Sequence, residues 1–235
     1  MRERVRRHLL SQLLCLGRHT LTGVIGTSGR LFCDWSADYR MYSDQRVDPT
    51  KLFAPVRRTL IAGLDDAAPL VAALDDTRLH KSGRKTHGVK YTRDPMGPPF
   101  HVNFIKAQRF VQISAACPAD NGMARMIPID FVHAPTPQKP RRNADEPTRA
   151  RFRQAQREMA LPKVGADRLL ALRNSMDEDG QRDRPLWSVV DGGYTNRTFI
   201  KHLPTRTTAV GRIRADAKLY HLPEATEGKP CLLYT

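Results

Sequence analysis

The sequence predicts an α/β protein: a mixed sheet with flanking helices, preceded by a mainly helical segment. Residues 1–66 carry apolar side chains at helical spacing. From residue 67 to about residue 215, short apolar runs of strand length alternate with helical patterns. Two of the runs, at 69–76 and 185–191, end in aspartates, as expected of buried strands with polar groups at their carboxyl ends. We therefore expect two parts, residues 1–66 and residues 67–235.

The first part is expected to contain several helices. Residues 5–16 predict one, in which four leucines at helical spacing are expected to face a core: Leu9, Leu10, Leu13 and Leu14. Glycines and serines in the stretch 21–43 mark turns, and Asp34 or Ser36 is expected to cap a helix that begins close behind them. The pattern KLFAPVRRTLIAGL at 51–64 predicts a further helix.

The second part is expected to alternate strands and helices. Partial apolar and polar alternation predicts sheet strands, one of which holds Trp187 as a core residue. A basic excursion rich in proline and arginine covers residues 133–160. The expected strands are 69–76, one or two within 101–117, 126–135, 185–191 and 207–214, and the expected helices are 148–159, 166–177 and 196–203.

Charge points to a polyanionic partner. The chain has 39 Lys and Arg against 24 Asp and Glu, a net charge of +15 and a pI of about 10.2. Such a surface repels itself unless nucleic acid or another polyanion is near, so nucleic acid is the leading partner. The four cysteines form no CxxC pair, which favours reduced thiols in a cytoplasm over a zinc module. No apolar run approaches the roughly 18 residues of a membrane span, so no membrane partner is expected.

Two aspartates are the candidates for chemistry. Asp76 ends the run at 69–76 and Asp191 ends the run at 185–191. If the two strands are neighbours, both carboxylates face one cleft at the carboxyl edge of the sheet. Two carboxylates that share divalent ions suit phosphodiester cleavage, and Mg²⁺ is the ion that oxygen ligands of this kind prefer. An aspartate after a strand is also a common turn former or helix cap, and the residues alone leave both interpretations open.

Basic side chains near these aspartates are candidate phosphate ligands. Lys81, Arg84 and Lys85 follow Asp76 in a glycine-containing loop, and Arg197 follows Asp191 closely. Three arginines spaced by four residues share one helix face that suits a phosphate backbone: Arg149, Arg153 and Arg157. A solvated basic loop and a solvated helix are the alternative interpretations.

Three stretches give the chain a family resemblance. LDDTRLHKSGRKTHGVKYTRDPMGPPFHVNFI resembles the first-aspartate region of bacterial insertion-sequence transposases of the DDE superfamily, with its Asp-Thr pair and Lys-x-Gly-x-Lys loop. VVDGGYTN resembles the second-aspartate region, and LTGVI together with DWSADYRMYS resembles the helical segment in front of the catalytic core. The resemblance extends from residue 21 to about residue 223.

The resemblance implies an RNase H-like core that cuts and joins the DNA ends of an insertion sequence with Mg²⁺, for which Mn²⁺ can substitute. Asp76, which precedes Thr77, matches the first acid of the family better than Asp75, and Asp191 matches the second. Asp75 would then be either a neighbouring residue that supports Asp76 or an alternative metal ligand. The implied partners are transposon ends and target DNA. A homodimer and a bacterial, nucleoid-associated cytoplasmic location follow from the family alone.

One departure from the family concerns its third acid, a Glu on a later helix. Glu224 and Glu227 lie in HLPEATEGKP, whose proline and glycine favour a loop. We therefore expect a chain truncated before the Glu helix: a fragment, a shortened gene product or a remnant of a decayed element. Whether such a chain cleaves DNA by itself is left open. The alternative function is a non-catalytic DNA-binding protein descended from a transposase.

Overall fold

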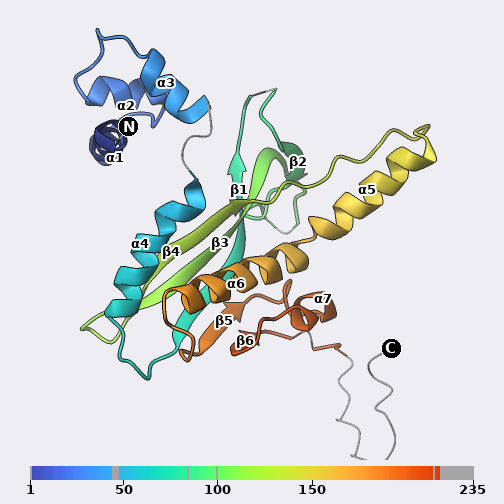
Figure 1. Ribbon diagram of the computed structural model, residues 1–235. Coiled ribbons are helices and arrows are strands. Elements are labelled where there is room, and N and C mark those ends of the chain that lie inside the picture. Colours follow the sequence, from blue (N-terminus) through green and yellow to red (C-terminus); the bar gives the residue numbers. More distant parts are fainter. Residues whose placement is uncertain (1, 44–47, 84, 99, 214, 218–235) are drawn as a thin grey trace, which may run out of the picture. The chain divides into compact units, whose positions relative to one another are not determined.

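The computed structural model describes residues 2–43, 48–83, 85–98, 100–213 and 215–217 (Figure 1). The chain divides into two compact units, residues 1–52 and residues 53–235. Helix α4 (Pro49–Ala62) spans the boundary between the units and ends just before residue 66, where the sequence texture changes. No helix in the described ranges is long and apolar enough to cross a membrane.

The first unit is centred on a buried aspartate. Its helices are α1 (Arg2–Leu14), α2 (Leu21–Thr27) and α3 (Ser36–Ser43). Asp38 of α3 is 1% exposed, and its Oδ1 accepts hydrogen bonds from His8 Nε2 at 2.8 Å and from Arg7 Nη2 at 3.2 Å. Burial raises the pKa of Asp38, but these hydrogen bonds outweigh burial and hold the pKa below its ordinary value. The unit therefore buries a charged polar cluster beside apolar side chains such as Ile25 and Met41.

The helix expected at 5–16 is confirmed as α1, but the expected burial of its leucines is wrong. Their side chains are between 50% and 83% exposed: Leu9, Leu10, Leu13 and Leu14. The helix instead buries His8 and Ser11, because it packs toward Asp38 through its polar face. Residues 21–27, where turns were expected, form α2, and Thr20 caps this helix by accepting a hydrogen bond from Gly23 N at 3.1 Å.

The second unit is built on a six-stranded mixed sheet. The strand order is β2–β3–β1–β5–β6, and β4 also pairs with β3. β1 runs antiparallel to β3 and parallel to β5, which is parallel to β6. This confirms the predicted fold class and is consistent with an RNase H-like core. The strands are β1 (Leu70–His80), β2 (Lys90–Arg93), β3 (Phe104–Pro118), β4 (Ala124–His133), β5 (Leu186–Val190) and β6 (Thr207–Gly211).

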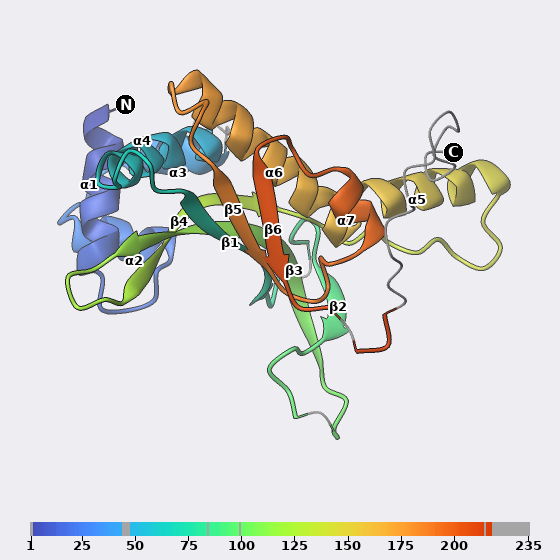
Figure 2. The ribbon, with the colours of Figure 1, turned by 90° about the horizontal axis from the view of Figure 1, so that it is seen from below.

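Helices cover one face of this sheet. Besides α4, the unit contains α5 (Glu146–Glu158), α6 (Leu161–Glu178) and α7 (Arg197–Lys201). Figure 2 shows α4 and α6 on the same side of the sheet. Apolar residues of α6 recur every three or four positions and are buried against the inward side chains of β1. The main members of this core are Leu70, Ala72, Leu74, Ala166, Leu169, Leu172 and Met176.

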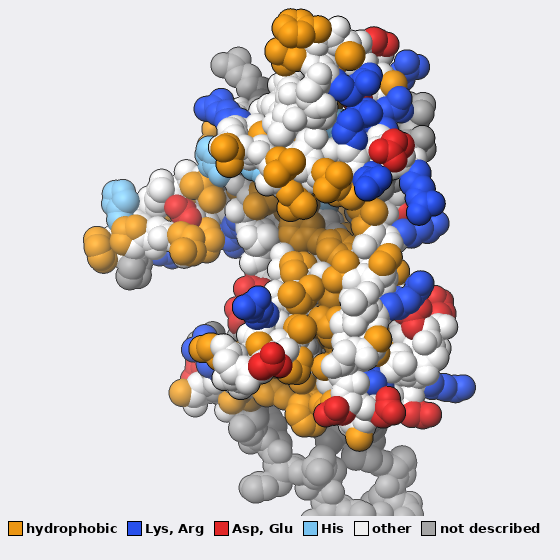
Figure 3. Space-filling view, turned by 90° about the vertical axis from the view of Figure 1, so that its left-hand side faces the viewer, with side chains coloured by type: hydrophobic (Ala, Val, Ile, Leu, Met, Phe, Trp, Pro, Cys, Tyr) orange, Lys and Arg blue, Asp and Glu red, His pale blue; other side chains and the backbone are white. Residues whose placement is uncertain are grey.

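The other face of the sheet carries exposed apolar side chains. Trp187, Val189 and Val210 are 46%, 42% and 51% exposed. Trp187 was expected in the core. This expectation is wrong, because successive side chains of β5 point to opposite faces of the sheet. Leu186 and Val190 point inward, which turns Trp187 outward. Figure 3, a view of the molecule from another side, also shows exposed hydrophobic side chains among Lys and Arg.

A buried arginine joins the end of α6 to the start of β5. Arg173 is 2% exposed, and its guanidinium donates to the carbonyl oxygens of Gln181 at 2.6 Å and Arg184 at 2.7 Å. It also donates to Asp177 Oδ1 at 2.9 Å. One side chain thus satisfies two carbonyls of the α6–β5 connection and sets where β5 enters the sheet.

Candidate active site between β1 and the end of β5

The sheet brings the two predicted aspartates close to each other. β1 and β5 are parallel neighbours with Leu74 opposite Val190, so Asp191 follows the end of β5 beside the Asp75–Asp76 part of β1. The expected end of the first strand at Asp76 is wrong, because β1 continues to His80 while it pairs with β3. Asp76 is half-buried, whereas Asp75 and Asp191 are exposed. The sequence interpretation depended on these strands being adjacent, and that condition is met.

Strand alternation separates Asp76 from Asp75. Asp76 lies opposite Val111 of β3 and shares the inner sheet face with Leu74, whereas Asp75 belongs to the outer face. Asp75 Oδ1 accepts a hydrogen bond from Asp76 N at 2.8 Å, which occupies one of its oxygens locally. In the described part of the chain, no side chain donates a hydrogen bond to the Asp76 carboxylate. Asp76 is therefore the acid whose oxygens stay available on the inner face.

Burial is the main reason that the pKa of Asp76 is raised. Asp75 and Asp191 raise this pKa further, while Arg78 and Arg109 lower it. The Asp191 charge is thus one of those that act on the Asp76 carboxylate, as the smallest of these contributions. Like charges held close together are stabilised by a cation between them, so the pair is suited to a divalent ion.

A glycine turn holds Asp191. Its Oδ1 accepts a hydrogen bond from Gly193 N at 2.8 Å, and its carbonyl oxygen accepts from Tyr194 N at 3.1 Å. A Cβ on Gly193 would lie 3.1 Å from Asp191 Oδ1, so the absence of a side chain leaves room for the carboxylate. Asn196 closes the turn as the cap of α7, since its Oδ1 accepts from Phe199 N at 3.1 Å.

Arg109 is a site residue that the sequence interpretation missed. It lies on the inner face of β3, and its guanidinium donates to the carbonyl oxygens of Ala134 and Met159, both at 2.8 Å. Met159 lies in the elbow between α5 and α6, so Arg109 ties this elbow to the sheet beside Asp76. An arginine at an inward position of an alternating strand (Ala107, Arg109, Val111) was the available signal.

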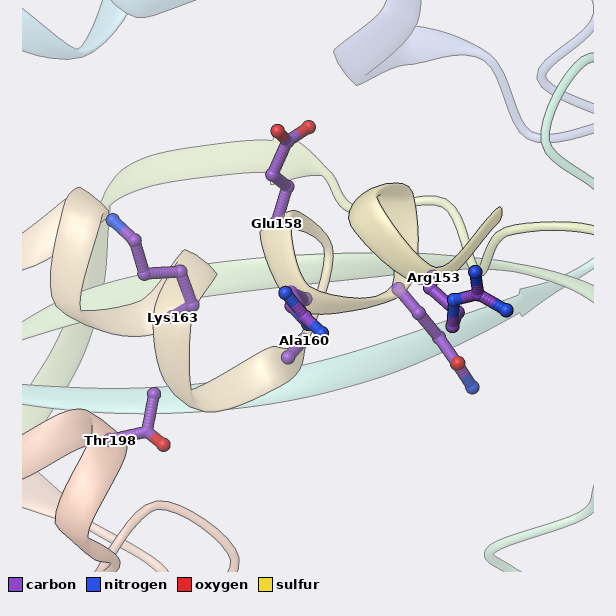
Figure 4. Close-up of a pocket in the computed structure, with 7 residues that line it drawn as sticks. Arg153, Glu158, Ala160, Lys163 and Thr198 are labelled. Atoms are coloured by element: carbon purple, nitrogen blue, oxygen red, sulfur yellow. The ribbon is translucent and has the colours of Figure 1, made fainter. Parts of the chain in front are cut away.

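The elbow between α5 and α6 forms a basic pocket of about 750 Å³. Arg153, Lys163 and Thr198 line it from α5, α6 and α7 (Figure 4). Arg157 also lines this pocket. Of the three arginines expected on one face of α5, Arg149 instead donates to the carbonyl oxygen of Arg142 at 2.8 Å. Arg153 pairs with Glu146 at the start of α5.

The remaining predicted phosphate ligands belong to the β1–β2 connection and to the start of α7. Lys81 and Lys85 lie in the β1–β2 connection, with Lys81 N donating to the Lys106 carbonyl oxygen at 2.8 Å. Arg84 lies outside the described residues. Arg197 is exposed as the first residue of α7, next to Thr198 in the basic pocket. The structure thus brings Arg153, Arg157 and the start of α7 together and leaves the lysines on a separate loop.

The donor set fits a magnesium ion that substrate oxygens complete. Among the described residues, no group of three or more His, Cys, Asp or Glu side chains is arranged to hold a metal. One or two carboxylates with phosphate oxygens and water are a usual Mg²⁺ environment, and Asp76 and Asp191 would supply the carboxylates. The segment with Glu224 and Glu227 lies outside the described residues.

Comparison with known proteins identifies the family. A family model described as DDE superfamily endonuclease matches residues 1–231, almost the whole chain. No curated protein and no solved structure matches the chain. The match agrees with the parallel β1–β5 pair and its two aspartates. The chain therefore belongs to the DDE superfamily endonuclease family.

Proposed function

We propose that this protein is a DNA transposase that cuts insertion-sequence ends and joins them to target DNA. The observation that carries the proposal is the parallel pairing of β1, which holds Asp76, with β5, which Asp191 follows, in a chain of net charge +15. Membership in a family of endonucleases supports nucleic acid as the substrate. The helical segment 1–66 would precede a catalytic core at 67–235.

In this proposal, Asp76 and Asp191 hold Mg²⁺, or Mn²⁺ in its place. The bound ions would activate the attacking water or hydroxyl and stabilise the leaving oxygen of the phosphodiester. The protein's own part is positioning: the β1–β5 register sets the separation of the acids, and the Gly193 turn orients Asp191. Arg109 offsets part of the negative charge near Asp76.

The DNA backbone is proposed to lie along the basic pocket and the nearby loops. Three basic side chains line this pocket: Arg153, Arg157 and Lys163. Arg197 directly precedes Thr198, which also lines it. Arg149 on α5 and the β1–β2 loop with Lys81, Arg84 and Lys85 would contact phosphates further along. The proposed partners are transposon ends, target DNA and a second copy of the chain, in a bacterial nucleoid.

A second candidate function is DNA binding without catalysis, as a remnant of a transposase. The observation that favours it is the lack of a third acid beside Asp76 and Asp191 within the described ranges. The basic pocket and the family membership are equally compatible with this candidate.

Metal binding tests the acid pair directly. Titration of the full chain with Mn²⁺ in a calorimeter should show saturable binding. The Asp76→Ala/Asp191→Ala variant should bind at least about 100-fold more weakly, because even the loss of groups that only support metal ligands costs about 10–100-fold. Equal binding by wild type and variant would refute the metal site and leave the two aspartates as turn formers.

The basic pocket predicts a change in the salt dependence of DNA binding. Each phosphate contact contributes about −0.9 to the slope of log K against log salt, so Arg153→Ala/Arg157→Ala should make the slope less steep by about 1.8. Anisotropy of a labelled duplex, titrated with the full chain at several NaCl concentrations, measures this slope.

A matched control removes two arginines from the other end of the sheet. Arg125 is exposed near the start of β4, and Arg182 is exposed just before β5. Arg125→Ala/Arg182→Ala should leave the slope near the wild-type value. The proposed DNA path is wrong if both double variants change the slope equally, or if the Arg153/Arg157 variant leaves it unchanged.

A further inference from the structure

A buried tyrosine beside the acid pair has a hydroxyl with no partner. Tyr194 is 1% exposed, and in the described structure its hydroxyl makes no hydrogen bond. Buried tyrosine hydroxyls usually find a partner, because an unpaired buried polar group costs about 1–3 kcal/mol. An unpartnered donor at this place in the fold therefore requires an explanation.

The ring of Tyr194 is fixed on three sides. A Cβ on Gly165 of α6 would lie 2.8 Å from Tyr194 Cε1 and 2.8 Å from Leu74 Cδ2, so only glycine lets helix, ring and strand approach this closely. Phe199 packs against the ring edge-to-face, with centroids 5.8 Å apart. The backbone is held as well, since Tyr194 N donates to the carbonyl oxygen of Asp191. The hydroxyl therefore has one position, set by packing.

Three carboxylates are the negative charges that act on this hydroxyl. Burial raises the pKa of Tyr194, and Asp76, Asp75 and Asp191 raise it further, with Asp76 the strongest of the three. A tyrosine hydroxyl can donate a hydrogen bond to a carboxylate. Asp76 shares the inner sheet face with Leu74, against which the ring packs, and the described residues offer its carboxylate no other side-chain donor.

We propose that Tyr194 is a positioning residue: when the Asp76 side chain turns to bind a divalent cation, the Tyr194 hydroxyl donates a hydrogen bond to its carboxylate and holds it in that orientation. The inference rests on the proposed function, because it assigns Asp76 as a metal ligand. In that orientation one oxygen of Asp76 would accept from the phenol, and the other oxygen would be directed to the ion. Partners of this kind fix ligand geometry and commonly change metal affinity by about 10–100-fold.

Tyr194→Phe tests the inference because it keeps the ring and removes only the hydroxyl. Mn²⁺ binding of the full chain, measured by calorimetry, should weaken by about 10-fold or more. Without metal, the melting temperature should stay the same or rise, because the substitution removes an unpaired buried group. A merely structural role would lower the metal-free melting temperature and leave the Mn²⁺ affinity unchanged.

Two further variants separate the possible outcomes. Tyr91→Phe removes a hydroxyl from a side chain that is 69% exposed on β2, and it should bind Mn²⁺ as the wild type does. Gly165→Ala keeps the hydroxyl but displaces the ring, and it should also weaken Mn²⁺ binding. The inference is overturned if Asp76→Ala/Asp191→Ala has lost Mn²⁺ binding while Tyr194→Phe binds Mn²⁺ with an affinity within twofold of the wild type. Unchanged binding in that double variant overturns the proposed function itself.

Discussion

Substitution of either aspartate by asparagine is expected to abolish Mg²⁺-dependent DNA cleavage. Asp76→Asn and Asp191→Asn keep the size of the side chain but remove the negative charge that would hold the ion. Stabilisation of transition-state charge by a metal amounts to several kcal/mol, and each 1.36 kcal/mol is a tenfold change in rate. The expected loss is therefore about 10³-fold or more. Conversion of supercoiled plasmid to nicked circles by the full chain with Mg²⁺ or Mn²⁺ measures it.

Asp75→Asn is the matched control for this experiment. Asp75 is adjacent in sequence but lies on the outer sheet face, with one oxygen bound to Asp76 N. It should reduce nicking far less than Asp76→Asn. Nicking retained by either Asp76→Asn or Asp191→Asn would rule out the assigned acid pair. A wild-type chain that binds DNA and metal but does not nick would select the non-catalytic candidate.

Arg173→Leu is expected to cause the largest loss of stability. The substitution leaves the carbonyl oxygens of Gln181 and Arg184 without a donor in a buried site and removes a partner of Asp177. Breaking a buried charged network in this way costs about 3–5 kcal/mol. At about 2–4 °C per kcal/mol for a unit of this size, the melting temperature should fall by roughly 6–20 °C.

Thermal denaturation followed by circular dichroism measures this change. Arg182→Leu, on the same α6–β5 connection but exposed, should stay within about 0.5 kcal/mol of wild type. A shift of similar size in both variants would mean that the buried network does not hold β5 in place. The metal site should weaken together with stability in Arg173→Leu, since β5 delivers Asp191.

The candidate site could be predicted from sequence only where it is local. An apolar run that ends in an aspartate marks both Asp76 and Asp191, because strand and acid are neighbours in the chain. That β1 pairs with β5 could only be assumed at the sequence level, because the pairing of strands far apart in the chain leaves no pattern in the residues of either strand. Arg109 was missed although its inward position in an alternating strand was a local signal. The α5–α6 elbow that it holds lies 50 residues further along the chain, so its role could not be predicted from the residues around it.

Burial was predicted less well than secondary structure. Helical spacing identified α1 correctly, yet the same spacing gave no indication that His8, rather than Leu9 or Leu13, is the buried side. A cluster of arginines and a histidine around Asp38 decides that question, and Asp38 lies thirty residues away. Trp187 was misplaced because a short apolar strand does not reveal whether both of its faces are covered.

The strand order also determines when the acid pair comes together during synthesis. β1, β3 and β4 are antiparallel neighbours, so this half of the sheet can form once residue 133 has been made. Asp191 arrives more than a hundred residues after Asp76, and only when β5 inserts beside β1. Pairing between such distant strands is slow, because a long loop must close first. A nascent or partly folded chain would therefore carry the arginines of α5 before its carboxylate pair comes together.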